Sequence, residues 1–147
     1  MMKKNILLVS FLLFTLILSA CGVSEAPGST QQAEASSSSA ALFQIIKADG
    51  TTFDVTLEAV KALPLVQLQA EGKVEEGPYL KDILALAGIT EFTEVTLMGS
   101  SNPATLTFEQ VDENTILDFN NHGTMKLSST YIPKANWTKD VAQITVK

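Results

Sequence analysis

The chain contains no arginine, one cysteine and one histidine among its 147 residues. Arginine supplies a planar fork of donors that grips phosphate, sulfate or carboxylate groups bidentately, so its absence disfavours a tightly held oxyanion. A single histidine, His122, excludes the multi-histidine sites typical of zinc enzymes. A single cysteine, Cys21, excludes an intrachain disulfide and any site with several thiolate ligands.

The N-terminal segment has the order of a secretory signal. Lys3 and Lys4 precede an apolar run from Ile6 to Leu18, which is shorter than the ~20 residues of a membrane-spanning helix. The run ends in Leu18-Ser19-Ala20-Cys21, which resembles a bacterial lipobox. That resemblance implies cleavage before Cys21 and a diacylglyceryl group on its thiol. The alternative is an ordinary signal peptide with a chance cysteine.

Lipidation would place the protein on the extracytoplasmic face of the cell membrane and leave the rest of the chain without a thiol. The mature chain keeps eight lysines against sixteen acidic residues, a net charge of −8. This acidity argues against nucleic acid as a partner, because phosphate binding depends on basic residues.

Three segments are expected: a signal peptide at 1–20, the lipidated cysteine with a flexible tether at 21–41, and one small domain at 42–147. The tether is rich in Ser and Ala and has almost no bulky apolar residue, so it cannot offset the entropy of ordering. The domain is long enough for a single hydrophobic core.

Strands outnumber helices in the expected domain, which is therefore assigned to the α+β class. Apolar residues with a period of two, and Asp49-Gly50 at a hairpin turn, indicate the strands. Helical spacing indicates two short helices, and the segment from Glu71 to Gly77 is expected to be a charged loop. The expected strands contain Phe43 and Ile45; Phe53, Val55 and Leu57; Leu65 to Gln69; Val95 and Leu97; Ala104, Leu106 and Phe108; Ile116 to Phe119; and Val141, Ile144 and Val146. The expected helices are Leu57 to Leu63 and the turns around Leu80, Ile83, Leu84 and Ala87.

The order of these elements resembles the oxidoreductase molybdopterin-binding domain, which has the sulfite-oxidase-like fold. The similarity covers most of residues 42–147. Its clearest motif is a glycine followed by an amphipathic helix, carried here by Gly77, Leu80, Ile83, Leu84 and Gly88. Further matches are Asp49-Gly50 with Val55 to Glu58, the strand containing Val95, Leu97 and Gly99, and the run from Trp137 to Val141. The resemblance implies a mixed, mostly antiparallel sheet.

The departures from this family concern its chemistry. Its catalytic members coordinate molybdenum through a cysteine thiolate and hold phosphate and substrate with Arg and His. No residue of this domain matches those positions, so the resemblance implies a reduced relative without the metal chemistry. No cofactor is therefore expected, with molybdopterin as the alternative.

Four residues are candidates for ligand binding. Tyr131 and Trp137 flank a segment containing Asn136, and such an aromatic pair could line a pocket or cap the core. His122 could act with Asp112, Glu113 or Asp118 in acid–base or metal chemistry, or could lie in a surface turn. No catalytic residue and no metal site are predicted.

Two functions of different class follow from these observations. The first is a lipoprotein whose domain is a non-catalytic module that binds a small molecule or a protein. The second is an oxidoreductase, or its accessory subunit, in which the fold still holds molybdopterin or another cofactor. The missing Arg, Cys and His chemistry favours the first, and only the family resemblance favours the second.

Overall fold

The computed structural model describes residues 40–147. The predicted signal peptide, Cys21 and the tether up to residue 39 lie outside the described residues. Strand β1 (Ala41–Ile46) begins one residue before the predicted start of the domain. Within residues 40–147, no helix is long and apolar enough to cross a membrane.

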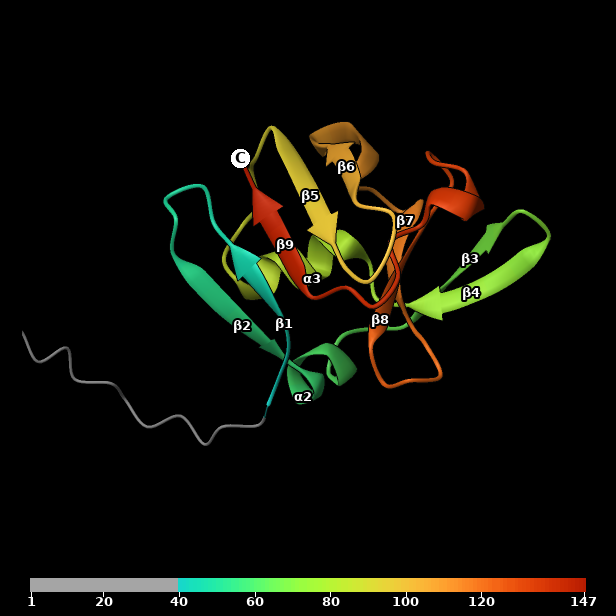
Figure 1. The fold of residues 1–147 in the computed structure, drawn as a ribbon, viewed down its shortest axis with the longest axis horizontal. Coiled ribbons are helices and arrows are strands. Elements are labelled where there is room, and N and C mark those ends of the chain that lie inside the picture. The colour runs from blue at the N-terminus through green and yellow to red at the C-terminus, as the bar shows by residue number, and fades with distance from the viewer. Residues whose placement is uncertain (1–39) are drawn as a thin grey trace, which may run out of the picture. The chain divides into compact units, whose positions relative to one another are not determined.

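A five-stranded sheet forms the centre of the domain (Figure 1). Its strand order is β2-β1-β9-β5-β6, so the first and last strands of the domain are neighbours inside the sheet. The β1–β9 pair is parallel and the other three pairs are antiparallel. The remaining strands are β2 (Thr52–Thr56), β5 (Glu94–Met98), β6 (Ala104–Thr107) and β9 (Gln143–Val146).

The period-two pattern explains how this sheet forms. Alternate residues of β1 and β5 are fully buried, whereas the residues between them are exposed or half-buried. The predicted β1–β2 turn is present, because Gly50 takes a φ of 83° and Asp49 accepts hydrogen bonds from both the backbone and the hydroxyl of Thr51. Such a φ strains any residue with a side chain.

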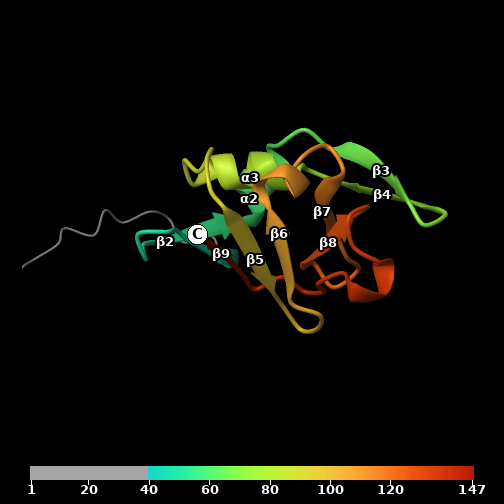
Figure 2. The same cartoon turned by 90° about the horizontal axis from the view of Figure 1, so that it is seen from above.

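Two short α-helices connect the strands, as predicted. Helix α2 (Leu57–Lys61) begins where the Thr56 hydroxyl accepts a hydrogen bond from the Ala59 N–H. Helix α3 (Leu80–Leu86) buries Leu80, Ile83 and Leu84 completely. Both helices lie on one face of the five-stranded sheet (Figure 2).

Two further hairpins make separate two-stranded sheets. One pairs β3 (Val66–Ala70) with β4 (Lys73–Gly77), and the other pairs β7 (Thr115–Phe119) with β8 (Met125–Ser129). The expected charged loop from Glu71 to Gly77 is therefore wrong, since most of it is strand β4. Its only large apolar residue, Val74, is 59% exposed, so β4 carries no alternating apolar signal. Strand β8 was also not predicted.

Phe108 is a second correction. It was expected in a strand with Ala104 and Leu106, but it lies in the short 3₁₀ turn η1 (Phe108–Gln110) and is 46% exposed. The turn begins at a capping box in which Thr107 and Gln110 satisfy each other's backbone groups. The strand therefore ends one residue before Phe108.

Two hydrophobic clusters fill the interior. The larger one lies between the five-stranded sheet and α3 and draws on most of the predicted core residues. The smaller one packs Leu68 and Ala70 of β3 against Ile116 and Trp137. Among residues 40–147, all buried members of both clusters lie between Phe43 and Val146.

Two glycines allow close backbone contact between segments that are distant in the sequence. A Cβ atom on Gly77 would lie 2.0 Å from the carbonyl oxygen of Leu117 in β7. A Cβ atom on Gly99 would lie 2.0 Å from the carbonyl oxygen of Lys139. Both glycines belong to the motifs that resemble the family. Close packing explains why each position carries a residue without a side chain.

Candidate functional site

His122 lies in an exposed turn between β7 and β8. Its backbone N–H donates to the side-chain oxygen of Asn120 at 2.9 Å. Among residues 40–147, no three His, Cys, Asp or Glu side chains are placed to hold a metal ion together. The structure therefore places His122 in a surface turn.

Tyr131 is 41% exposed and points its hydroxyl at an acidic residue. The hydroxyl donates to Asp112 Oδ2 at 2.6 Å. This hydrogen bond raises the pKa of Tyr131. Partial burial works to raise the pKa of Asp112, but hydrogen bonds from Tyr131 and Asn114 outweigh it and lower that pKa. Tyr131 thus ties the segment after β8 to the loop after η1.

Trp137 belongs to the smaller core cluster and is 2% exposed. Its indole N–H donates to the carbonyl oxygens of Ser129 and Ile132, at 3.0 and 3.2 Å. The ammonium groups of Lys126 and Lys134 lie 5.5 and 5.4 Å from the ring centroid, within the range of cation–π attraction. Trp137 therefore supports the chain around the short turn η2 (Lys134–Asn136) rather than facing a ligand.

The two lysines also belong to an ionic cluster. Lys126 Nζ lies 3.1 Å from Glu75 and 3.0 Å from Asp118, and Lys134 Nζ lies 3.5 Å from Glu75. Burial is the main reason that the pKa of Asp118 is raised, with a hydrogen bond to Glu75 acting in the same direction. The cluster joins β4, β7, β8 and η2 and leaves both lysines already paired.

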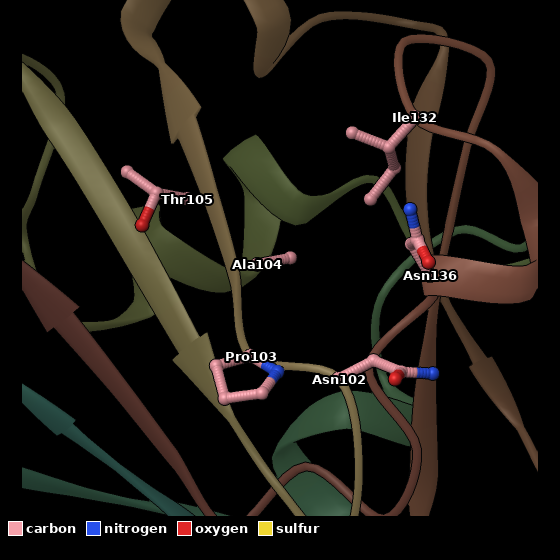
Figure 3. A pocket seen from close by; sticks show the side chains of 6 residues that line it. All are labelled: Asn102, Pro103, Ala104, Thr105, Ile132 and Asn136. Atoms are coloured by element: carbon pink, nitrogen blue, oxygen red, sulfur yellow. The ribbon is translucent and has the colours of Figure 1, made fainter.

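Asn136 is the predicted candidate that does line a pocket. The pocket has a volume of about 290 Å³ and lies between β6 and the segment that contains η2. Figure 3 shows Pro103, Ala104 and Thr105 on one side, with Ile132 and Asn136 across the opening. None of its lining residues is charged; they are Asn102, Pro103, Ala104, Thr105, Ile132 and Asn136.

Hydrogen bonds fix one end of this pocket. The Asn102 side chain donates to the carbonyl oxygen of Ala135 at 2.8 Å, and the Thr138 hydroxyl donates to the carbonyl oxygen of Asn102 at 2.6 Å. Asn102 has a φ of 49°, a left-handed conformation that Asn tolerates better than most residues. These hydrogen bonds hold the two sides of the pocket in place at this end.

Sequence reasoning did not identify most of these lining residues. The Ser-Asn-Pro run before β6 forms the connection between β5 and β6. Asn102 and Thr105 line the pocket because the chain around η2 packs opposite them. The contact between Asn102 and Ala135 joins residues that are 33 positions apart in the sequence. No local pattern carries such information.

A polar cluster around Asp140 lies next to the strand ends. Asp140 accepts hydrogen bonds from Ser100 at 2.6 Å, Thr124 at 2.5 Å and Asn120 at 2.7 Å. These bonds, that of Ser100 first, lower the pKa of Asp140 from 3.8 to about 2. The cluster joins the β5–β6 and β7–β8 connections to the chain before β9.

This cluster predicts acid sensitivity. A carboxyl group with a lowered folded-state pKa stabilises the fold above its unfolded pKa, and that contribution is lost as the pH falls toward the folded value. For Asp140 the loss should occur between pH 3.8 and about 2. We expect Asp140→Asn to flatten the pH dependence of the free energy of unfolding in this window, measured by urea titration. Parallel pH curves for the two proteins would contradict the assignment.

Comparison with known proteins supports the fold. No protein-family model matches the sequence, and no curated protein matches it. Among solved structures, the chain is similar to the sulfane dehydrogenase SoxCD from Paracoccus pantotrophus, with a TM-score of 0.55 and 18% identity. The similarity covers 71% of this chain and 37% of the SoxCD chain, so this protein spans little more than a third of that chain's length. The predicted α+β fold of the sulfite-oxidase-like, molybdopterin-binding type is thereby confirmed.

The residues of the domain do not fit a molybdenum cofactor. The resemblance implies a thiolate ligand, but residues 40–147 contain no cysteine, and Cys21 precedes β1 by twenty positions. It also implies Arg and His for phosphate and substrate, and the chain has no Arg. Lys126 and Lys134 are engaged with carboxylates, so they do not replace arginine.

Proposed function

We propose that the chain is a lipoprotein, attached through Cys21 to the extracytoplasmic face of the cell membrane, whose domain is a non-catalytic binding module. The observation that supports binding is the uncharged pocket beside β6, where Asn136 is exposed and its amide is not engaged by any other side chain of residues 40–147. An amide offers both donors and an acceptor to a ligand. The partner is a protein segment or a small molecule.

Membrane attachment can be tested through Cys21. Two acyl chains give stable anchoring, because each buried methylene contributes ~0.8 kcal/mol. We expect Cys21→Ser either to release the protein from membranes or to leave its signal peptide uncleaved, as measured by cell fractionation and mass spectrometry. A Ser variant of mature length that stays in the membrane fraction would contradict lipidation.

Binding at the pocket can be tested in the intact anchored protein. We expect a photo-crosslinking amino acid in place of Asn136 to capture a specific partner in whole cells of the organism that makes the protein. The adduct is identified by mass spectrometry, which distinguishes a polypeptide from a small molecule.

The matched control places the same crosslinker at Thr52, an exposed residue of the opposite edge strand β2. The proposal requires an adduct at position 136 that is absent at position 52. Equal adducts at both positions, or none at position 136, would argue against a binding module at this pocket.

The second candidate is an oxidoreductase or its accessory subunit that holds molybdopterin or another cofactor. The structural similarity to sulfane dehydrogenase supports it. Metal analysis and pterin extraction distinguish the two functions, provided that the protein is purified from a host that makes molybdopterin. Stoichiometric molybdenum or pterin would favour this second function over the binding module.

A further inference from the structure

Strand β6 is the last strand of the five-stranded sheet, and its outer edge faces the pocket. One hydrogen bond shows which residues of β6 point their backbone groups toward β5. The Phe108 N–H donates to the Thr93 carbonyl oxygen at 3.2 Å, so Phe108 and Thr93 form a hydrogen-bonded pair. This pair continues the register in which Glu94 lies opposite Thr107. Bonded and non-bonded pairs alternate in an antiparallel ladder, so the Thr105–Thr96 pair is a non-bonded one.

The backbone N–H and C=O of Thr105 therefore point away from β5, toward the open edge. The Thr105 side chain turns elsewhere, because its hydroxyl lies 3.0 Å from the hydroxyl of Thr96. Thr107, two residues further along β6, also points its backbone away from β5, but its N–H already donates to the Gln110 side chain at 3.0 Å. Within residues 40–147, Thr105 thus presents a backbone donor and acceptor to the pocket that no other described residue engages.

We propose that the pocket binds a short extended polypeptide segment of a partner protein, which adds to the sheet as a strand beside β6. This inference rests on the proposed binding function of the pocket and specifies its ligand. The segment would exchange backbone hydrogen bonds with Thr105, as in other cases of β-strand addition. Its other edge would face Asn136 across the pocket, whose amide can pair with a second set of backbone groups (Figure 3).

The dimensions favour a short segment over a second folded subunit. Strand β6 has four residues, about 13 Å of strand at ~3.3 Å per residue. A pocket of about 290 Å³ is at the small end of ligand sites, which span roughly 300–1,000 Å³. Stable interfaces between folded proteins bury about 1,200–2,000 Å², more than one four-residue edge supplies.

The charge around the pocket specifies the segment further. The six lining residues are uncharged, whereas Glu109 and Asp112 follow at the C-terminal end of β6. The nearby Lys134 is paired with Glu75. A carboxylate in the bound segment would therefore meet acidic neighbours at the C-terminal end of β6. The segment should carry small, uncharged side chains and no acidic residue.

The test uses the chain from Gly22 to Lys147, which contains every residue of the two clusters described within residues 40–147 and every residue of the pocket. A displayed library of seven-residue peptides, built from Gly, Ala, Ser, Thr, Val and Asn, is selected against it. Binding of the selected peptides is followed by NMR chemical shifts and calorimetry. The expected shifts centre on Thr105 and Asn136.

Two variants separate strand addition from other binding. Thr105→Pro removes the outward N–H and should weaken binding about tenfold or more, because one backbone bond is lost and a partner group is left unpaired. Thr52→Pro is the matched control on the opposite edge strand. The Ile46–Thr52 pair is likewise non-bonded, since the Lys47 N–H donates to Thr51, so Thr52 also points its backbone outward. Proline is tolerated at such positions, and Thr52→Pro should leave affinity unchanged.

N-methylation of the peptide gives the most specific readout. Along a paired strand, every second N–H faces the neighbour, so methylation should abolish binding at the alternate positions that face β6 and have a smaller effect at the positions between them. Binding insensitive to methylation, equal loss in both proline variants, or the absence of any selected binder would overturn the inference. Protection of the Thr105 amide from exchange without peptide would also overturn it, because the outer edge of β6 would then not be open. In each of these cases the crosslinking result at position 136 still decides the proposed binding function independently.

Discussion

Gly77→Ala is expected to destabilise the domain by about 3 kcal/mol or more. The added Cβ would lie 2.0 Å from the Leu117 carbonyl oxygen and 2.7 Å from its carbon, and neither is the flexible end of a side chain. The only relief is movement of β4 away from β7. That movement would disturb the adjacent hydrogen bond from Leu117 N–H to the Pro78 carbonyl oxygen. Overpacking of this kind costs at least ~1–3 kcal/mol.

The matched control is Gly50→Ala at the β1–β2 turn. Nothing lies within 4 Å of a Cβ at that position, so the cost comes only from its φ of 83°. A left-handed conformation costs a residue with a side chain about 1–2 kcal/mol. Both variants are compared by urea unfolding. If Gly77→Ala proves no more destabilising than Gly50→Ala, the close contact between β4 and β7 is wrong.

Leu84→Ala should cost about 2–5 kcal/mol in free energy of unfolding. Leu84 is completely buried in α3, between the helix and the five-stranded sheet, and its removal leaves a cavity there. The loss would be a large part of the ~5–15 kcal/mol that stabilises an ordinary domain. Thermal or urea denaturation measures it directly.

The same substitution at Leu65 serves as the control. Leu65 precedes β3 and is 52% exposed, so its truncation removes much less buried surface. A cost below ~0.5 kcal/mol for Leu84→Ala, the range of ordinary surface substitutions, would undermine the fold assignment. A similar cost at both positions would do the same.

Where the sequence predicted the fold correctly, local pattern and final burial agree. Phe43 and Ile45 alternate with polar or half-buried neighbours in β1, and both are buried. The spacing of Leu80, Ile83 and Leu84 places all three on the buried face of α3. In such elements the period of the apolar residues is enough to predict the type of element and its buried face.

The two missed strands lack that agreement. In β4, Val74 is exposed, and Glu75 is held by Lys126 and Lys134 from distant parts of the chain. In β8, Ser128 and Ser129 are buried next to Leu127, so burial does not alternate along the strand. Both strands depend on contacts between hairpins, which a local pattern does not record.

The candidate site was predicted only in part for the same reason. Asn136 lines the pocket, whereas Tyr131, Trp137 and His122 do not belong to its lining. An aromatic pair in a sequence does not reveal which ring is buried. Here the indole N–H of Trp137 finds two carbonyl oxygens inside the domain, and the hydroxyl of Tyr131 finds Asp112 near the surface.

The parallel pairing of β1 with β9 also determines how the domain bears tension. A pull on the N-terminal end of β1, resisted at the edge of β6, must pass through the β1–β9, β9–β5 and β5–β6 ladders. Strand β1 is hydrogen-bonded on both sides, to β2 and to β9, so it can leave the sheet only if both ladders break. Forced unfolding is governed by the unfolding rate. The rate at which a stretched domain unfolds would therefore depend on the central strands. Destabilising the outer β3–β4 hairpin would leave that rate unchanged.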